Sequence, residues 1–210
     1  MRARILQAAA QVIGRNGTDR TTIDDFIIAA GASRGTFYNH FESRQALLDE
    51  LWRIAGRDPF RDIGTIAGRI ECPAARFAAT SRMVLRRALG DSTWGWLVVA
   101  LSASEATLTE DLRAYPVPDL REAKRTGRFK YDDEKAAVDL VVGTMRGGLR
   151  ALLEEERDAT YADSLCRMLL LALGVASSEA RRLSAAPLPD GGPASSVFRP
   201  DSSPVGSAPR

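Results

Sequence analysis

Hydrophobic side chains recur at spacings of three and four from the start of the chain to about Leu183, and alternating apolar and polar runs of useful length are absent. A spacing of three and four places side chains on one face of an α-helix, whereas alternation places them on one face of a strand. The pattern therefore predicts an all-α fold. No unit of about 20 to 50 residues repeats, so a solenoid is not expected.

The N-terminal end predicts two helices separated by a short turn. The first runs from about Arg2 to Arg15 with apolar side chains on one face, and Gly17 can end it in a left-handed conformation. Thr22 opens the sequence Thr-Ile-Asp-Asp, a pattern in which the hydroxyl caps the first backbone amides of a helix. A second helix is therefore expected directly after Thr22.

The next segment predicts a tight turn between two short helices. Gly31 permits the turn, and Ser33 can cap a third helix, Arg34 to about Phe41, that buries Phe37 and Phe41 and turns polar side chains outward. A fourth helix begins after Ser43. This is the arrangement of a helix-turn-helix, whose second helix fits the major groove of DNA. A three-helix core that binds nothing shows the same pattern, so the spacing alone leaves both interpretations open.

The stretch from Ala30 to Leu48 reads AGASRGTFYNHFESRQALL. It resembles the DNA-binding domain of TetR-type transcriptional regulators, in which Gly, a small residue and Ser precede Gly-Thr, an aromatic residue or Leu, Tyr, and then His-Phe before Lys and Leu. The resemblance extends from Ile5 to Leu48. Arg44 stands where the family usually has Lys and preserves the charge, whereas Glu42 replaces a residue that is often basic and weakens the local positive field.

The resemblance implies that one part of the motif contacts the DNA backbone and another part reads base edges, where Arg can bond guanine and Asn adenine. Residues 1–53 hold seven Arg and six acidic residues, so nonspecific affinity for DNA is expected to be modest and strongly salt-dependent. The implied backbone contacts are Thr22, Tyr38, His40 and Arg44. The residues implied to lie nearest the bases are Arg34, Gly35, Thr36 and Asn39, which follow Ser33 at the start of the third helix.

The remainder of the chain predicts a connector of short polar turns over residues 53–72 and a helical domain over residues 73–184. The expected helices are Pro73 to Leu89, around Trp94 to Ser102, a long one capped by Asp132 or Asp133, and about Thr160 to Leu183, with Pro116 and Pro118 interrupting the segment before the long helix.

The resemblance further implies that this domain holds a pocket for a small-molecule inducer. Aromatic and Met side chains at helical spacing are candidates for its lining, although the same set is typical of an ordinary core. No acidic or basic cluster indicates an ionic ligand, so a mainly apolar molecule is expected. The candidates are Phe77, Met83, Trp94, Trp96, Tyr115 and Met145.

Apolar residues occupy most of the circumference of the last two long helices, and Gly143, Gly147 and Gly148 remove side chains from one face. One core needs only one face of each helix, so the pattern predicts a second buried surface, a four-helix interface in a two-fold homodimer. The family resemblance implies the same pair as dimerisation helices. Two helices buried completely within a monomer would produce the same pattern.

Composition excludes several other classes. His40 is the single histidine, and Cys72 and Cys166 stand far apart in the sequence, so we expect no metal site, no catalytic residues and no cofactor. No apolar stretch is long enough to cross a bilayer and the start of the chain lacks an apolar signal region, which predicts a cytoplasmic protein without a membrane partner. Residues 185–210 are rich in Pro, Ser and Gly and predict a disordered tail.

These predictions combine into one hypothesis: an N-terminal three-helix helix-turn-helix DNA-binding domain over residues 1–52, joined to a C-terminal helical ligand-binding and dimerisation domain. The chain would act as a homodimeric repressor on a palindromic DNA operator, with half-sites about 34–36 Å or a multiple apart, and a small-molecule inducer would release it. An activator or a regulator without a ligand would share this fold, and a dimerisation module that no longer binds DNA is a further alternative. An enzyme on a helical bundle has no candidate catalytic pair.

Overall fold

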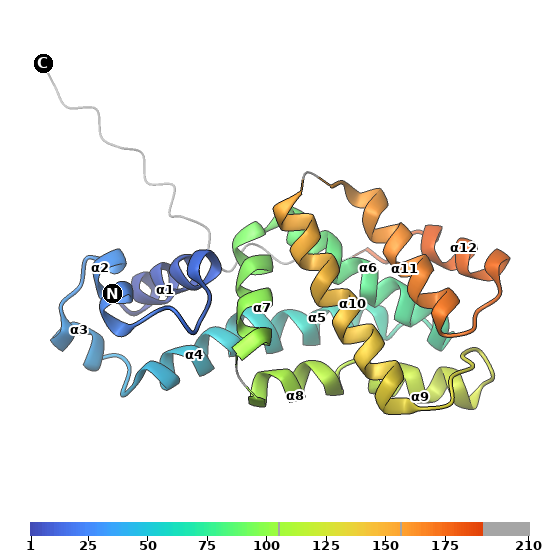
Figure 1. The fold of residues 1–210 in the computed structure, drawn as a ribbon, viewed down its shortest axis with the longest axis horizontal. Helices are drawn as coiled ribbons and strands as arrows, with labels where there is room; N and C mark the ends of the chain where they lie inside the picture. The colour runs from blue at the N-terminus through green and yellow to red at the C-terminus, as the bar shows by residue number, and fades with distance from the viewer. Residues whose placement is uncertain (105, 156, 191–210) are drawn as a thin grey trace, which may run out of the picture.

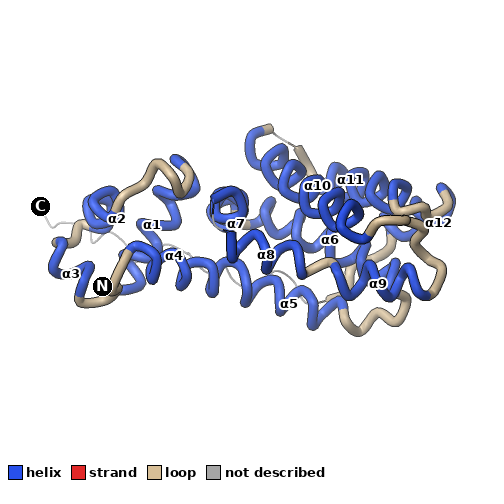
Figure 2. Tube along the Cα trace, turned by 60° about the horizontal axis from the view of Figure 1, so that its bottom comes forward, coloured by secondary structure: helices blue, strands red, loops and turns tan. Residues whose placement is uncertain are grey.

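The computed structural model describes residues 1–104, 106–155 and 157–190. Within these ranges the chain forms helices and turns without a strand (Figure 2), which confirms the all-α prediction. The elements are α1 (Arg2–Asn16), α2 (Ile23–Ala30), α3 (Arg34–Tyr38), α4 (Arg44–Trp52), the π-helical turn η1 (Arg53–Arg57), α5 (Asp58–Ala67), α6 (Pro73–Gly90), α7 (Ser92–Ser104), α8 (Ala106–Ala114), α9 (Val117–Arg125), α10 (Glu134–Glu154), α11 (Ala159–Ala172) and α12 (Ser177–Ala185).

The described chain is elongated (Figure 1). Helices α1 to α4, here called the head (residues 1–52), lie at one end, and helices α6 to α12, here called the body (residues 73–185), form the other end, with α7 facing the head. Helix α7 packs against α1. The two parts are therefore joined by packing as well as by the chain between them.

The segment between head and body is helical, and the prediction of a connector made of short turns is wrong. Helices α4 and α5 run on through η1 as one connecting helix (residues 44–67). Pro59 lies in the first turn of α5, where its missing N–H costs little. A Cβ atom on Gly56 would lie 2.3 Å from the Trp52 ring, so this glycine marks a close approach to an indole instead of a chain reversal.

One hydrophobic core extends from the head into the body. Trp94 of α7 is fully buried in it, and its indole N–H donates a hydrogen bond to the carbonyl of Ala55 in η1. Trp96, two residues further along α7, lies against α1. A Cβ atom on Gly14 of α1 would lie 3.1 Å from the Cβ of Trp96. Two tryptophans of the body therefore hold the head and the connecting helix in place.

A second core fills the far end of the body between α6, α9, α10, α11 and α12. Phe77 and Phe129 meet there edge to face, with ring centroids 5.4 Å apart. The predicted helix from Thr160 to Leu183 is interrupted, because Gly174 adopts a positive φ of 83° between α11 and α12. The backbone at this break is hydrogen-bonded to a distant segment of the chain, because the N–H of Lys130 donates to the carbonyl of Leu173.

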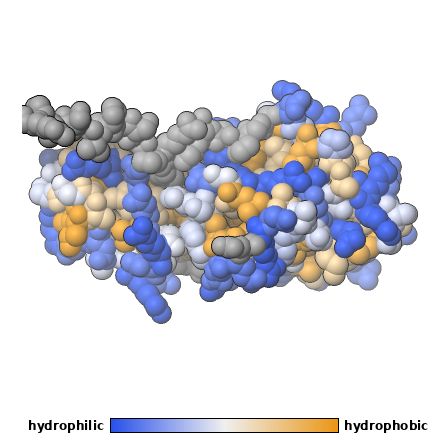
Figure 3. Space-filling view, turned by 90° about the horizontal axis from the view of Figure 1, so that it is seen from above, coloured by the Kyte–Doolittle hydropathy of each residue, from blue (hydrophilic) through white to orange (hydrophobic). Residues whose placement is uncertain are grey.

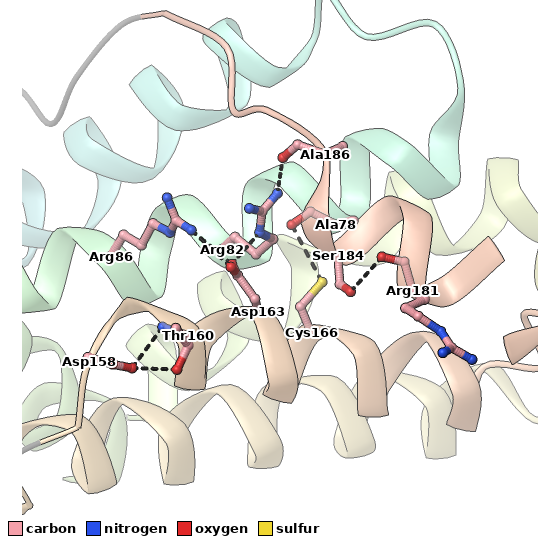
Figure 4. Close-up of polar contacts among 10 residues, drawn as sticks. All are labelled: Ala78, Arg82, Arg86, Asp158, Thr160, Asp163, Cys166, Arg181, Ser184 and Ala186. Carbon is pink, nitrogen blue, oxygen red and sulfur yellow. Dashed lines mark hydrogen bonds and ion pairs between the residues drawn. The ribbon is translucent and has the colours of Figure 1, made fainter. Parts of the chain in front are cut away.

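The chain beyond α12 returns along α6 (Figure 4). The guanidinium of Arg82, whose side chain is 4% exposed, donates to Asp163 of α11 and to the carbonyl of Ala186. Arg86 pairs with the same carboxylate. The start of the predicted disordered tail is thus hydrogen-bonded to the body, and the tail from residue 191 on lies outside the described residues.

Candidate functional site

Side-chain caps define the helix-turn-helix of the head. The backbone N–H of Thr22 donates to the carboxylate of Asp25, while the Thr22 hydroxyl accepts a bond from the N–H of Asp25. The backbone bond from Thr22, followed by the bond from its hydroxyl, lowers the pKa of Asp25. Gly31 ends α2 with a left-handed φ of 56°, and the Ser33 hydroxyl accepts from the N–H of Thr36 to start α3. The predicted caps and turn are confirmed.

Two arginines tie the ends of α2 to the neighbouring helices. Arg44 of α4 donates to the carbonyls of Thr18 and Thr21 before α2. Arg4 of α1 donates to the carbonyls of Ala30 and Gly31 at its end, at 2.7 and 2.9 Å. The guanidinium of Arg44 is therefore engaged with the backbone in this structure, and its predicted contact with a DNA phosphate stays a prediction.

The outer surface of α3 carries most of the residues that the motif singles out. Phe37 and Phe41 face the core at 0% and 4% exposure, so the predicted inner face is confirmed. Tyr38 is half-exposed and touches Phe37 edge to face. Helix α3 ends at Tyr38, earlier than predicted, and Asn39 and His40 lie in the turn that follows. The residues exposed on this surface are Ser33, Arg34, Gly35, Tyr38, Asn39 and His40.

Thr22 and Thr36, the remaining predicted DNA contacts, both take part in caps. The Thr22 hydroxyl lies 2.8 Å from the Asp25 carboxylate, and the Thr36 hydroxyl lies 2.8 Å from that of Ser33. Such bonds hold the two hydroxyls at the N-termini of α2 and α3.

Sequence reasoning missed the partner of Arg34. One terminal nitrogen of its guanidinium, Nη2, lies 2.6 and 2.7 Å from the two carboxylate oxygens of Asp24 on α2. This bond and the charge of Asp24 raise the pKa of Arg34. The two residues are ten positions apart and on different helices, so no spacing rule for a single helix indicates the contact.

The body encloses a cavity of about 760 Å³ between α5, α6, α7, α8, α9 and α10. Three of the six predicted lining residues, Phe77, Tyr115 and Met145, line it. Met83 packs on the core away from the cavity, and Trp94 and Trp96 lie on the sides of α7 that face the core and α1. Large aromatic side chains were favoured by size, but their position around α7 decides what they contact.

Charged residues also reach the cavity wall, which sequence reasoning did not indicate. Four arginines line it, and three of them have carboxylate partners: Arg76 with Asp119 and Glu122, Arg113 with Asp139, and Arg150 with Glu154. Of the described residues none pairs with the fourth, Arg146. Thr80 and Ser81 also line the cavity, and their hydroxyls are assigned no hydrogen bond to another described residue.

Aromatic contacts connect the cavity to the connecting helix. Phe60 of α5 lines the cavity, and its ring lies 4.9 Å from that of Tyr115, 6.5 Å from Trp52 and 6.2 Å from Trp94. The Tyr115 hydroxyl donates to the carbonyl of Phe60 at 2.8 Å, and burial raises the pKa of this phenol. The indole of Trp52 donates to Asp111 on α8. Phe60 therefore lies between the cavity and Trp52, the last residue of α4.

An apolar surface lies on the outer faces of α10 and α11. Leu140, Met168 and Leu171 are 39%, 60% and 38% exposed. Figure 3 shows hydrophobic surface over the half of the molecule that contains these helices. Gly143 and Gly147 of α10 are exposed and also line the cavity, and a Cβ atom on either would meet no atom within 4 Å.

A helix-turn-helix with an exposed polar face, joined to a helical body around a cavity, defines a DNA-binding transcriptional regulator. Two family models match the chain: one described as bacterial regulatory proteins of the tetR family matches residues 5–51, and one described as the tetracyclin repressor-like C-terminal domain matches residues 72–186. The chain belongs to the TetR family.

Individual relatives support this assignment. The transcriptional regulator AcrR of Shigella flexneri is 27% identical over 112 residues, which cover 53% of this chain and 44% of that protein. The transcriptional repressor KstR2 of Rhodococcus jostii is 36% identical over 52 residues, 25% of this chain and 26% of that protein. The chain matches about a quarter of the length of the first curated relatives.

Solved structures extend the likeness to the body. RolR in complex with resorcinol is 27% identical and has a TM-score of 0.69, with 90% of this chain and 95% of that one covered. CprB of S. coelicolor, at 19% identity, has a TM-score of 0.67, with 88% and 94% covered, and shows the fold alone. Of the helices in the described ranges, none combines the length and the hydrophobicity that a bilayer crossing needs.

Proposed function

We propose that the chain is a homodimeric, ligand-responsive transcriptional repressor that binds a palindromic operator and is released from it by a small, mainly apolar molecule. The observation that carries this proposal is the position of Phe60. This side chain lines the cavity and also contacts Trp52 and Trp94, which support the connecting helix. A molecule in the cavity therefore acts on the same side chain that helps to place the head.

The head supplies the contact with DNA. Helix α3 is the recognition helix, in which Arg34 and Asn39 read base edges while Tyr38 and His40 contact phosphates. All four side chains are exposed. Because caps and backbone-bound arginines hold α2 and α3 in fixed positions, the recognition helix meets DNA with little loss of conformational entropy.

The outer faces of α10 and α11 supply the dimer interface. A glycine inside a helix costs up to about 1 kcal/mol relative to Ala. Gly143 and Gly147 line the cavity and are also exposed, so they leave room for a second helix to approach α10 closely. Exposed Leu140, Met168 and Leu171 provide the apolar surface beside them. A two-fold pair of α10 and α11 buries this surface and places two heads on one side of the dimer.

The cavity supplies the ligand site. Its volume suits a small organic molecule, and its wall is largely apolar, with Phe60, Phe77 and Met145 among the lining residues. Most of its arginines are paired with carboxylates, which favours a neutral guest over an ionic one. The likeness to RolR, solved with resorcinol, supports a small guest with hydroxyl groups, and Thr80 and Ser81 provide hydroxyls to meet it.

The test combines DNA binding and release. Duplexes that the wild-type protein selects from a random 30-bp pool are used as operator in fluorescence anisotropy, and a panel of small neutral molecules that begins with resorcinol is titrated in. We expect a palindromic site, nanomolar binding at moderate salt, and release by at least one member of the panel. A selected site without two-fold symmetry contradicts the proposal. So does a protein–DNA complex that no member of the panel releases, provided that native mass spectrometry detects no molecule already bound to the purified protein.

Matched variants separate the two sites. Thr80→Phe fills the cavity, whereas Met83→Phe changes the same helix outside it. We expect Thr80→Phe to keep operator binding and lose release, and Met83→Phe to keep both. For the interface, Met168→Glu is expected to yield monomers in sedimentation, whereas Ile28→Glu, at an apolar side chain of α2 that is 78% exposed, leaves the dimer intact.

A further inference from the structure

We propose that Asp24 determines the DNA specificity of the head, because its carboxylate positions Arg34 for base reading and its charge lowers the affinity for DNA of any sequence. The inference rests on the proposed function of the head as the DNA contact. Asp24 is a positioning residue here, since it acts through Arg34.

Asp24 contacts only one of the three nitrogen atoms of the Arg34 guanidinium. Both carboxylate oxygens of Asp24 lie within 2.7 Å of the single nitrogen Nη2 of Arg34. The Nη1 and Nε groups of Arg34 bond to no other described residue. A guanidinium carries five N–H donors in a planar fork, so a carboxylate at Nη2 leaves the donors at Nη1 and Nε unused. A bidentate contact with a base must include Nη2, because Cδ separates Nη1 from Nε. Nη2 carries two N–H groups, so Asp24 and the base share this nitrogen.

The pair faces outward. The side chains of Arg34 and Asp24 are 63% and 54% exposed, so the contact is not a part of the hydrophobic core and contributes little to folding. Arg34 is the first residue of α3 and Asp24 lies in the first turn of α2. The contact therefore spans the turn of the helix-turn-helix on the surface that carries the predicted base-reading residues.

Holding Arg34 in place has a direct consequence for base discrimination. A bidentate bond to guanine requires the guanidinium plane to align with two acceptor atoms, and a free arginine side chain samples many rotamers that do not. A carboxylate that restricts those rotamers before binding lowers the entropy lost on contact. Asp24 thus favours the base that matches the held orientation over the other three.

The charge of Asp24 acts on all DNA sequences alike. Residues 1–53 hold seven arginines and six acidic residues, and Arg2 and Arg53 pair with Glu50. The positive field of the head is therefore weak, and an exposed carboxylate beside Arg34 reduces it further. Nonspecific affinity depends on phosphate neutralisation, so Asp24 suppresses it.

The test compares base preference and affinity among variants of the full chain. Wild type, Asp24→Asn, Asp24→Glu and Glu42→Gln are each used to select sites from the same random 30-bp duplex pool, and affinities for the wild-type site and a scrambled duplex are then measured at several salt concentrations. Glu42 is an exposed acid of the head to which no ion pair is assigned among the described residues, so Glu42→Gln removes one charge without touching Arg34. Asp24→Glu keeps the charge and moves the carboxylate by one methylene.

We expect Asp24→Asn to lower the ratio of specific to nonspecific affinity about five- to tenfold and to relax the preference at one base pair per half-site. Asp24→Glu is expected to alter the same base pair with nonspecific affinity unchanged. Glu42→Gln is expected to raise nonspecific affinity a few-fold with the preference unchanged. In an Arg34→Ala background, Asp24→Asn is expected to change no base preference, since the residue through which it acts is gone.

Two outcomes overturn the inference while leaving the proposed function intact. In the first, wild type and Asp24→Asn select the same site, and Asp24→Asn has the same ratio of specific to nonspecific affinity as Glu42→Gln. In the second, Asp24→Asn still changes the base preference in the Arg34→Ala background. A wild-type protein that selects no site instead overturns the proposed function of the head, and the inference with it. Circular dichroism spectra confirm that each variant is folded before selection.

Discussion

The head and the body place their arginines differently. In the head, Arg4 and Arg44 donate to backbone carbonyls and hold α2 in place, while Arg34 and its partner Asp24 are 63% and 54% exposed. In the body, Arg76 and Arg82 pair with carboxylates while their own side chains are 18% and 4% exposed. The difference fits the proposed functions, because a surface that reads DNA needs exposed donors on a rigid frame, whereas an apolar cavity needs its charges neutralised.

The two regions also differ in how far apart their functional residues lie in the sequence. The proposed DNA contacts fall within residues 22–44, whereas the residues that line the cavity range from Phe60 to Arg150. Contacts within a short segment form at low entropic cost, and contacts across long loops require the whole body to pack first. The proposed site of the head thus depends on contacts between residues close in sequence, whereas the cavity of the body depends on contacts between distant residues. Substitutions at the boundary test whether the stability of the head depends on the body.

The largest effect is expected for Trp94→Ala at this boundary. Trp94 is fully buried and bonds to the carbonyl of Ala55, so its loss leaves a cavity and an unpaired carbonyl and lowers the free energy of unfolding by about 3–5 kcal/mol. Trp96→Ala, at a half-buried position on the same helix, serves as the control and is expected to cost less. Urea unfolding followed by circular dichroism measures both, and equal losses would contradict the larger contribution assigned to Trp94.

A smaller effect is expected for Arg44→Ala within the head. Loss of the bonds to Thr18 and Thr21 is expected to lower the free energy of unfolding by about 1–3 kcal/mol in the absence of DNA. Arg20→Ala removes an exposed arginine to which no contact is assigned and is the matched control. If Arg44→Ala unfolds like wild type and loses only DNA affinity, the residue serves as a phosphate contact and does not support α2.

The smallest effect concerns acid stability. Hydrogen bonds from Arg53 and then Arg2 lower the pKa of Glu50 from 4.5 to about 2. Because the folded pKa is lowered, the stabilisation is complete above the unfolded pKa and is lost as the pH falls from about 4.5 to 2. An ion pair at the surface is worth up to about 1 kcal/mol, so Glu50→Gln is expected to lower stability by that amount at pH 6 and by clearly less at pH 2, where about half of Glu50 is protonated in the folded protein. Urea midpoints at the two pH values measure both differences, and an equal difference at pH 6 and pH 2 contradicts the assigned cause.

The local features of the head were predictable because each depends on a few neighbouring residues. Thr22, Ser33 and Asp133 each cap the helix that the sequence pattern assigns to them, and Gly31 adopts the left-handed turn expected of it. The connecting helix was missed for the opposite reason. Gly56 and Pro59 are typical of turns, yet Gly56 accommodates the Trp52 ring and Pro59 starts a helix, and both facts depend on tertiary packing.

The cavity shows the same limit. Of the six candidates for the ligand pocket, Phe77, Tyr115 and Met145 line the cavity and Met83, Trp94 and Trp96 do not, whereas Thr80 and Ser81, which line it, were not among the candidates. Hydrophobicity and size indicate that a side chain is buried. The rotation of each helix about its axis decides whether that side chain contacts the core, another helix or the cavity.

The amino-acid sequence by itself determined the helical class, the caps, the turn and the exposed polar face of α3, because hydrogen bonds and hydrophobic periodicity within one helix or one turn depend on residues a few positions apart. Tertiary structure alone decided the pairing of Arg34 with Asp24, the engagement of Arg44 with the backbone and the contacts of Phe60 with Trp52 and Trp94. Those contacts join separate elements of the chain, and their partners are selected by the packing of the whole chain.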